Sequence, residues 1–338
     1  MEILRIWRLE SGKEIDIAQG MKRFILLLAV VLSTTNMYAQ MGVAKECVHY
    51  ATHEGQELYM DIYTPTNLGA EECNTPRPLM IFAFGGGFVG GARDVEFYMP
   101  FFERLAAEGI VVASIDYRLG LRDLPKDIGI RGMVEAMKRA VDIATEDMYA
   151  ATNYFLANSE GWNIDTSKIM ISGSSAGAIT AVTAEWQRCN GAPLAAVLPE
   201  DFRYAGVVSC AGAIFSVDGS PKFKSAPAPM LLFHGTSDSN VPYNKASVMG
   251  IGFYGSKYIT HQLDKLGSPY WFYSAEYVNH RLAGTPLFEQ QDLIMQFIRD
   301  YVIEGKRLRI QTDVESIGGE RHPTNFSVKD YLRANYAK

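Results

Sequence analysis

The chain has 338 residues, of which 48% are hydrophobic, and its 32 basic and 38 acidic side chains give a net charge of −6. This length suits one large domain with a substantial core. The mild acidic excess excludes a broad basic face and makes nucleic acid an unexpected partner. The spacing of the cysteine and histidine residues does not match a zinc site, so we expect no metal and no other cofactor.

Residues 21–39 have the layout of a secretory signal peptide. A basic pair precedes an uninterrupted apolar run over 24–32, and a polar stretch then ends at Ala39. The apolar run is shorter than the ~20 residues that a membrane-spanning helix needs. We therefore predict that residues 1–20 are an upstream extension and that the protein is exported, to the periplasm or the medium. No membrane span is expected after removal of the leader.

An alternation of apolar strands and helical stretches runs through residues 40–305. Helical spacing is present over 94–107 and, in a longer helix, over 133–155. This alternation favours a single α/β domain whose mainly parallel sheet is covered by helices on both faces. Residues 212–228 are interpreted as a cap or an entrance loop, and residues 306–338 as a polar tail of uncertain order.

Four cysteines occur along the chain, at Cys47, Cys73, Cys189 and Cys210. An even number in an exported protein permits disulfides, but their pairing cannot be read from the sequence. Cys210 ends an apolar run, which also suits a buried free thiol.

Three consecutive glycines at 85–87 follow an apolar strand that ends at Phe84. Without side chains, they let the backbone approach a ligand closely and point its N–H groups into a cavity. Such donors stabilise the oxyanion of a tetrahedral intermediate in acyl transfer. We predict that the N–H groups of Gly86, Gly87 and Ala176 form this oxyanion hole. The alternative is a flexible loop without a chemical role.

Residues 173–177 spell G-x-S-x-G between an apolar run and an alanine-rich, helix-forming stretch. A strand, a tight turn and a helix in this order hold the central serine in a strained conformation and expose its hydroxyl. The N-terminus of the following helix favours negative charge at the same place. We therefore predict that Ser175 is a nucleophile, while the hydroxyl of Ser174 points elsewhere. The alternative is an ordinary Gly/Ser turn.

The acid partner is expected after the apolar strand that begins at Pro229 and ends in His234 and Gly235. Asp238 follows, where its carboxylate can accept the Nδ1–H of a histidine and stabilise the imidazolium. The alternative role for Asp238 is a helix cap. Asp218 is a competing acid, although its sequence setting is typical of a surface turn.

Chain order selects the base among six histidines. His280 follows the apolar stretch 269–274, interpreted as the last core strand, and precedes a helix from about Pro286. This is where the base should follow the serine and the acid. His322, in the polar tail, is the alternate. His234 is expected to hold the acid loop.

Together these motifs resemble the α/β-hydrolase fold, specifically its carboxylesterase and lipase branch. The similar segments are F-G-G-G-F at 84–88, D-Y-R at 116–118, the opening strand at 58–65, the turn at 164–169 and the acid loop at 234–242. The similarity spans about 45–305. It departs at Phe84, where many members have a histidine that braces the loop, and beside His280, where the usual glycine is absent.

The resemblance implies a serine hydrolase that acts on carboxylic esters through an acyl-enzyme, without a metal or an organic cofactor. The expected substrate is a small-molecule or carbohydrate ester, and the oligomeric state is open. The alternatives are a serine peptidase of the same fold and a binding protein that has kept the scaffold without catalysis.

Overall fold

The computed structural model describes residues 42–336 except 68–74 and 126. The predicted upstream extension and signal peptide lie outside the described residues, and so does Cys73. Cys47, Cys189 and Cys210 are free thiols, and Cys210 is buried as the apolar run before it suggested. Within the described part of the chain, no helix is both long and apolar enough to cross a membrane.

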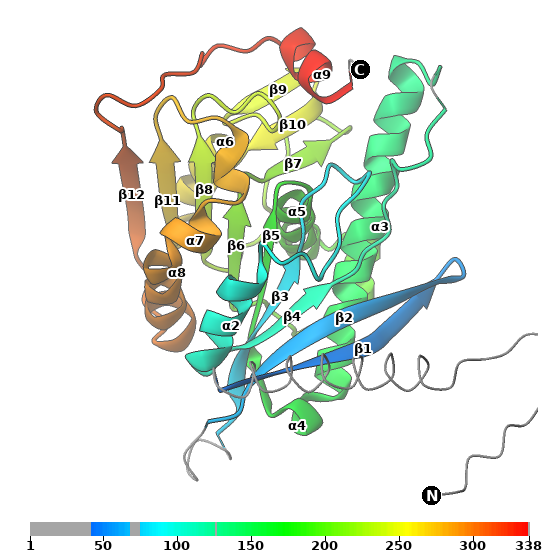
Figure 1. Ribbon diagram of the computed structural model, residues 1–338. Helices are drawn as coiled ribbons and strands as arrows, with labels where there is room; N and C mark the ends of the chain where they lie inside the picture. The colour runs from blue at the N-terminus through cyan, green and yellow to red at the C-terminus, as the bar shows by residue number, and fades with distance from the viewer. Residues whose placement is uncertain (1–41, 68–74, 126, 337–338) are drawn as a thin grey trace, which may run out of the picture.

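The core of the molecule is a nine-stranded sheet in the order β1-β2-β4-β3-β5-β6-β8-β11-β12 (Figure 1). The first two strands pair antiparallel, and β2 pairs antiparallel with β4, whereas all later pairs are parallel. The mainly parallel sheet is therefore as predicted. The strands are β1 (Val43–His53), β2 (Gln56–Pro65), β3 (Arg77–Ala83), β4 (Val111–Ile115), β5 (Ile164–Ser174), β6 (Gly206–Cys210), β8 (Met230–Gly235), β11 (Tyr270–Ala275) and β12 (Arg309–Val314).

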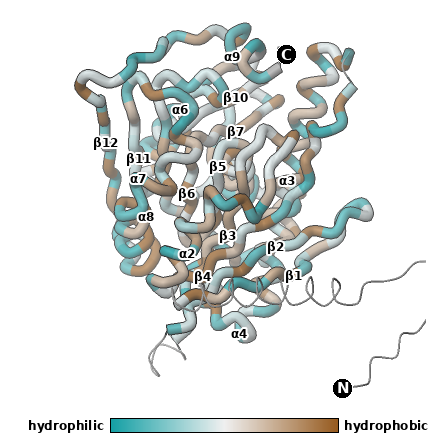
Figure 2. The backbone as a smooth tube through the Cα atoms, in the orientation of Figure 1, coloured by the Kyte–Doolittle hydropathy of each residue, from teal (hydrophilic) through white to brown (hydrophobic). Residues whose placement is uncertain are grey.

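Helices cover both faces of this sheet. The helices α2 (Met99–Ala107), α7 (Pro286–Glu289) and α8 (Gln291–Phe297) lie on one face, and α3 (Ile130–Ala157) and α5 (Ala176–Asn190) lie on the other (Figure 1). Every residue of β4, β6 and β8 is consequently buried, which explains their unbroken apolar sequences. The tube coloured by hydropathy shows the same distribution, with hydrophobic segments concentrated in the central strands (Figure 2).

The predicted helix over 94–107 is shorter in the structure, where it begins only at Met99. Pro100 lies in its first turn, where the fixed φ and missing N–H of proline are well tolerated, and it marks the start of the helix. Phe101 and Leu105 are buried as the spacing suggested, but Phe97 precedes the helix and is exposed.

Residues 306–338 are more than the polar tail that the sequence suggested. They contain β12, which pairs in parallel with β11, and the helix α9 (Val328–Tyr336). The stretch 269–274 is therefore not the last strand of the sheet. Exposed and half-buried positions alternate along β12, as in an edge strand, so its sequence lacks the apolar run that marks the inner strands.

A second, three-stranded antiparallel sheet lies near the carboxyl ends of the central strands (Figure 1). Its strands are β7 (Ala213–Ser216), β10 (Ile251–Gly255) and β9 (Lys245–Val248). Part of the predicted cap or entrance loop over 212–228 thus forms β7. The other elements are α4 (Ser159–Trp162), α6 (Ser256–Leu266), the 3₁₀ helices η2 (Pro193–Val197) and η3 (His280–Ala283), and the π-helical turn η4 (Ile298–Ile303).

Candidate active site

Ser175 lies in a sharp turn between β5 and α5. Its backbone has φ 50° and ψ −113°, a conformation that non-glycine residues rarely adopt. The turn is held by two hydrogen bonds, from the Ser175 N–H to the carbonyl of Cys210 at 2.9 Å and from the Ile179 N–H to the Ser175 carbonyl at 2.9 Å. The strained serine turn that the motif predicts is therefore present.

The two glycines of the motif are required by close backbone approaches. A Cβ on Gly173 would lie 2.2 Å from the carbonyl carbon of Gly177, and one on Gly177 would lie 2.0 Å from the carbonyl oxygen of Ala83. Both distances are far below van der Waals contact. The start of α5 is thus packed directly on the end of β3, and this packing fixes the position of the serine.

Ser175, His280 and Asp238 form one hydrogen-bonded line. Ser175 Oγ lies 2.8 Å from Nε2 of His280, and His280 Nδ1 lies 2.7 Å from Oδ2 of Asp238. Asp238 is in the turn after β8, and His280 begins η3 after β11. Because β8 and β11 are parallel neighbours, with Gly235 opposite Ala275, these two loops leave the same edge of the sheet. The structure thus brings the three predicted side chains together.

The protonation states within this line follow from Asp238. Its side chain is fully buried. Burial would raise its pKa, but hydrogen bonds from His234 and His280, together with their charge, hold the pKa well below the ordinary value of a carboxyl group. An ionised Asp238 only accepts hydrogen bonds, so the proton of His280 is on Nδ1. Nε2 is then free to accept the Ser175 hydroxyl proton.

His234 holds the acid loop, as expected. Its Nδ1 lies 2.8 Å from Oγ of Ser256, and its Nε2 lies 3.1 Å from the carbonyl of Val241 and 3.5 Å from Oδ2 of Asp238. Since the Val241 carbonyl only accepts, Nε2 carries a proton. The fully buried imidazole therefore ties the end of the acid loop at Val241 to β8 and α6.

The two competing residues occupy other places. Asp218 is exposed in the turn after β7, and the carboxylate in contact with His280 belongs to Asp238. His322 comes near the site from outside, with its Nε2 3.4 Å from the side-chain amide of Asn279. The nitrogen next to the Ser175 hydroxyl is that of His280.

The glycine loop passes directly beside the serine. A Cβ on Gly85 would lie 3.3 Å from Cβ of Ser175. Gly86 and Gly87 follow with φ of 141° and 63° and exposed backbones, and a Cβ on Gly86 would lie 2.1 Å from the carbonyl oxygen of Gly90. These conformations require glycine. Ala176, the third predicted donor, is the first residue of α5.

Tyr117 braces this loop, a role that the sequence did not indicate. Its hydroxyl donates to the carbonyl of Phe84 at 2.8 Å, and the two rings are stacked with centroids 4.4 Å apart. Burial raises the pKa of Tyr117, so the hydroxyl remains a donor. Tyr98 adds a second contact, because its hydroxyl accepts the N–H of Gly85 at 3.3 Å. The tyrosine of D-Y-R thus supports the loop at the position where Phe84 replaces a histidine.

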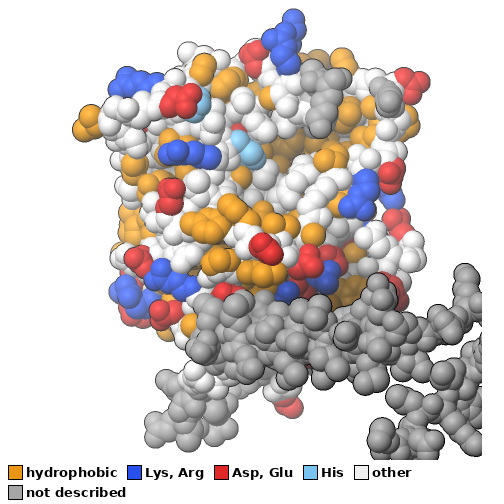
Figure 3. All heavy atoms as spheres, viewed as in Figure 1, with side chains coloured by type: hydrophobic (Ala, Val, Ile, Leu, Met, Phe, Trp, Pro, Cys, Tyr) orange, Lys and Arg blue, Asp and Glu red, His pale blue; other side chains and the backbone are white. Residues whose placement is uncertain are grey.

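Hydrophobic side chains gather on the face of the molecule that carries α2 and α7 (Figure 3). Among the exposed ones are Phe97 and Phe288, whose rings meet edge to face with centroids 4.4 Å apart. Phe97 immediately precedes Tyr98, and Phe288 follows the turn that begins at His280. A Cβ on Gly284, at the end of that turn, would lie 2.9 Å from Cζ of Phe97, so the aromatic pair lies beside the histidine turn.

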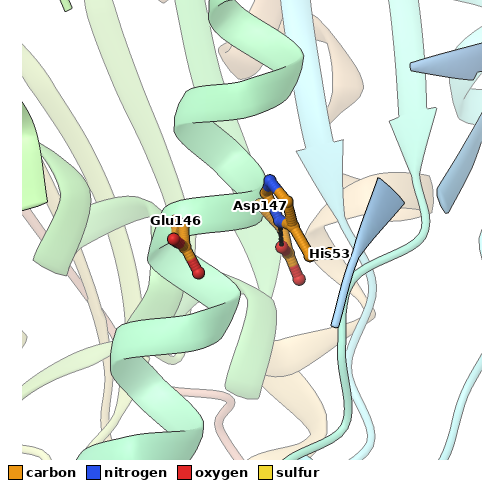
Figure 4. Close-up of side chains that lie close together, drawn as sticks. All are labelled: His53, Glu146 and Asp147. Atoms are coloured by element: carbon orange, nitrogen blue, oxygen red, sulfur yellow. Dashed lines mark hydrogen bonds and ion pairs between the residues drawn. The ribbon is translucent and has the colours of Figure 1, made fainter. Parts of the chain in front are cut away.

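A second group of titratable side chains brings His53 of β1 together with Glu146 and Asp147 of α3 (Figure 4). His53 Nδ1 is 2.7 Å from Asp147 Oδ1, while Arg118 Nε lies 3.0 and 3.1 Å from the two oxygens of Asp147 and its Nη2 also contacts Glu146. A cation bound here would face the guanidinium at close range. We interpret this cluster as a structural ion-pair network that joins β1, α3 and the segment after β4.

Comparison with known proteins bears on the fold and on the class of protein. Residues 60–192, which include the glycine loop and the serine turn, match the protein-family model BD-FAE. The chain is 30% identical over 138 residues to esterase B1 of Culex pipiens and 29% identical over 126 residues to the fumonisin B1 esterase of Sphingopyxis macrogoltabida. These matches cover 39% and 36% of this chain but 24% and 21% of the relatives, so the chain spans about a quarter of their length.

A solved structure extends the comparison to the whole fold. The apo form of esterase 2 from Thermogutta terrifontis matches with a TM-score of 0.56 and 21% identity, over 75% of this chain and 94% of the other. The chain therefore has the α/β-hydrolase fold. Within that fold it fits the carboxylesterase and lipase branch, so the resemblance inferred from the sequence motifs is confirmed.

Replacing Gly177 with alanine should destabilise the protein by about 3 kcal/mol, because the new Cβ meets backbone atoms of β3 that cannot rotate away. Urea unfolding of the purified variant measures the effect. Gly161→Ala is the matched control, since a Cβ there meets no atom within 4 Å, and it should change stability by less than about 0.5 kcal/mol. Equal unfolding midpoints for the two variants would contradict the close-approach explanation.

Replacing Tyr117 with phenylalanine should destabilise the fold by about 1–3 kcal/mol, because the buried carbonyl of Phe84 then loses the hydroxyl that donates to it. Tyr59→Phe serves as the control, since the Tyr59 hydroxyl donates to Glu57 at an exposed position. Its unfolding free energy should stay within about 0.5 kcal/mol of the wild type. If Tyr117→Phe lowers the free energy of unfolding no more than Tyr59→Phe does, Tyr117 does not brace the loop.

Proposed function

We propose that the protein is a carboxylic ester hydrolase with Ser175 as nucleophile, His280 as general base and acid, and Asp238 as the orienting carboxylate. The observation that supports this assignment most strongly is the hydrogen-bonded line of 2.8 Å and 2.7 Å that joins the three side chains beside the glycine loop. The esterase names of the similar proteins support the same class of reaction.

Each step of the proposed reaction follows from the protonation states. Nε2 of His280 takes the hydroxyl proton as Ser175 Oγ attacks the ester carbonyl. The resulting imidazolium is stabilised by the ionised, buried Asp238. The N–H groups of Gly86, Gly87 and Ala176 donate hydrogen bonds to the negatively charged carbonyl oxygen, and one such donor contributes about 3 kcal/mol.

The second half of the cycle uses the same groups in reverse. His280 donates its proton to the departing alcohol oxygen, which leaves an acyl ester on Ser175. Water then enters, His280 takes a proton from it, and the hydroxide attacks the acyl carbonyl. Collapse of that intermediate returns the proton to Ser175 Oγ and releases a carboxylic acid. Every proton transfer in the cycle passes through His280.

The proposed substrate is a small-molecule or carbohydrate ester. The exposed aromatic pair Phe97 and Phe288 beside the histidine turn suits an apolar part of such a substrate. The signal-peptide layout of residues 21–39 supports export, so that the reaction would take place in the periplasm or outside the cell.

The decisive test compares the wild type with Ser175→Ala on short p-nitrophenyl esters. Turnover should fall by about 10⁴-fold or more, because the attacking oxygen is lost. Ser174→Ala is a matched control from the same motif and should retain activity. A fluorophosphonate probe should label the wild type and Ser174→Ala but not Ser175→Ala.

Three results would redirect the proposal. Equal turnover by wild type and Ser175→Ala would refute the nucleophile. Faster cleavage of dipeptide amides than of matched esters would indicate a serine peptidase. Absence of both turnover and labelling in a folded wild type would favour a binding protein on the hydrolase scaffold.

A further inference from the structure

The segment of residues 320–336, here called the clasp, crosses the two loops that carry Asp238 and His280. It follows β12 and includes α9, which lies above the carboxyl ends of the strands (Figure 1). In the sequence, only the choice of His322 as the alternate base links this segment to the site. Its contacts fall on residues adjacent to the acid and the base.

His322 is the point where the clasp contacts both loops. Its carbonyl accepts the hydroxyl of Ser237 at 2.9 Å, and its N–H donates to the carbonyl of Tyr277 at 3.2 Å. Its ring nitrogen Nε2 lies 3.4 Å from the side-chain amide of Asn279. Ser237 immediately precedes Asp238, and Asn279 immediately precedes His280. One residue thus connects the neighbours of the two side chains.

The helix α9 adds a contact to the far side of the acid loop. The side-chain amide of Asn335 donates to the carbonyl of Asn240 at 3.0 Å, and the N–H of Asn240 donates to Oδ1 of Asp238 at 2.9 Å. Burial and the negative charges of Asp238 and Asp330 raise the pKa of Tyr331 in the same helix. At the other end of the clasp, the Arg321 guanidinium lies 4.6 Å from the ring centroid of Tyr277.

The two loops also contact each other directly, through hydrogen bonds from the Ser237 N–H to the carbonyl of Val278 at 3.0 Å and from the Tyr277 N–H to Oγ1 of Thr236 at 2.8 Å. These bonds fix the bases of the loops where they leave β8 and β11. The clasp also contacts Ser237 and Tyr277, and in addition it holds Asn240 and Asn279, which come later in the two loops. The clasp therefore contacts the acid loop on both sides of Asp238 and the histidine loop just before His280.

We propose that the clasp positions Asp238 relative to His280, with His322 and Asn335 as positioning residues that do not touch the substrate. The proposal rests on the function assigned above. A misplacement of about 1 Å in a reacting group can cost about 10²-fold in rate. Loss of one clasp contact, with the direct loop bonds intact, should lower kcat by about 10-fold and leave KM nearly unchanged.

The test uses the full chain and single substitutions in the clasp. His322→Ala and Asn335→Ala remove the two side-chain contacts. His322→Gln replaces the ring nitrogen with an amide oxygen that can accept from Asn279, and Asn325→Ala is the matched control at an exposed position of the same segment. For each protein, kcat and KM on a p-nitrophenyl ester are measured per fluorophosphonate-titrated site, together with the melting temperature. A chain ending at residue 319 removes the clasp altogether.

A second readout does not need a substrate. The proton between His280 Nδ1 and Asp238 should give a far-downfield resonance in the proton NMR spectrum of the wild type. It should broaden or disappear in His322→Ala and Asn335→Ala, and it should persist in His322→Gln and Asn325→Ala. The same resonance can be recorded for the truncated chain if that chain folds. If it does not fold, the single substitutions alone decide the role of the clasp.

The outcomes separate the two proposals. If the wild type hydrolyses no ester, the proposed function fails, while the resonance still decides the role of the clasp. If His322→Ala and Asn335→Ala keep the wild-type kcat and resonance, the positioning role is refuted. A lower melting temperature with unchanged kcat per site and an unchanged resonance would also refute it, because the clasp would then only stabilise the fold.

Discussion

The buried carboxylate of Asp238 is the constraint on which the rest of the site depends. A fully buried charge is costly unless it is hydrogen-bonded on all sides. Here Oδ1 accepts the N–H groups of Asn240 and Val241 at 2.9 Å each, and Oδ2 accepts from His280. Because the charge needs all of these partners, it fixes the loop around it and the orientation of the imidazole. The orientation of the imidazole then sets where the hydroxyl of Ser175 finds an acceptor.

Close approaches of the backbone bring these loops within reach of one another. Gly177 packs on the end of β3, and a Cβ on Gly235 would lie 2.1 Å from the carbonyl oxygen of Val278. At both places the absence of a side chain lets two segments from distant parts of the sequence touch. The serine turn is thereby set against the glycine loop, and the acid loop is set against the histidine loop. The chemistry of the site therefore depends on glycines that carry no functional group.

Much of this arrangement could be predicted from the sequence, because its signals are local. The glycine-flanked Ser175 and the apolar strands before Asp238 and His280 each mark a single turn at the end of a strand. No local pattern indicates the roles of Tyr117 and the clasp. Tyr117 gains its role only when the fold brings it to the carbonyl of Phe84, and the clasp only when the fold brings it to the two loops. The strand β12 was missed for a related reason, since an edge strand needs no unbroken apolar sequence. The helix α2 is shorter than its apolar spacing predicts, because Pro100 favours a helix start at this point.

The distances along the chain between the three aligned side chains have a consequence for how the site comes into being. Ser175 and His280 are separated by 105 residues, and Asp238 and His280 by 42. Each contact closes a long loop, and its entropic cost is recovered only when the intervening strands have paired. The site is thus a property of the completed sheet, and no short fragment of the chain could contain it. Local unfolding of β8 and β11 would separate Asp238 and His280 from Ser175 even while the other strands stayed paired.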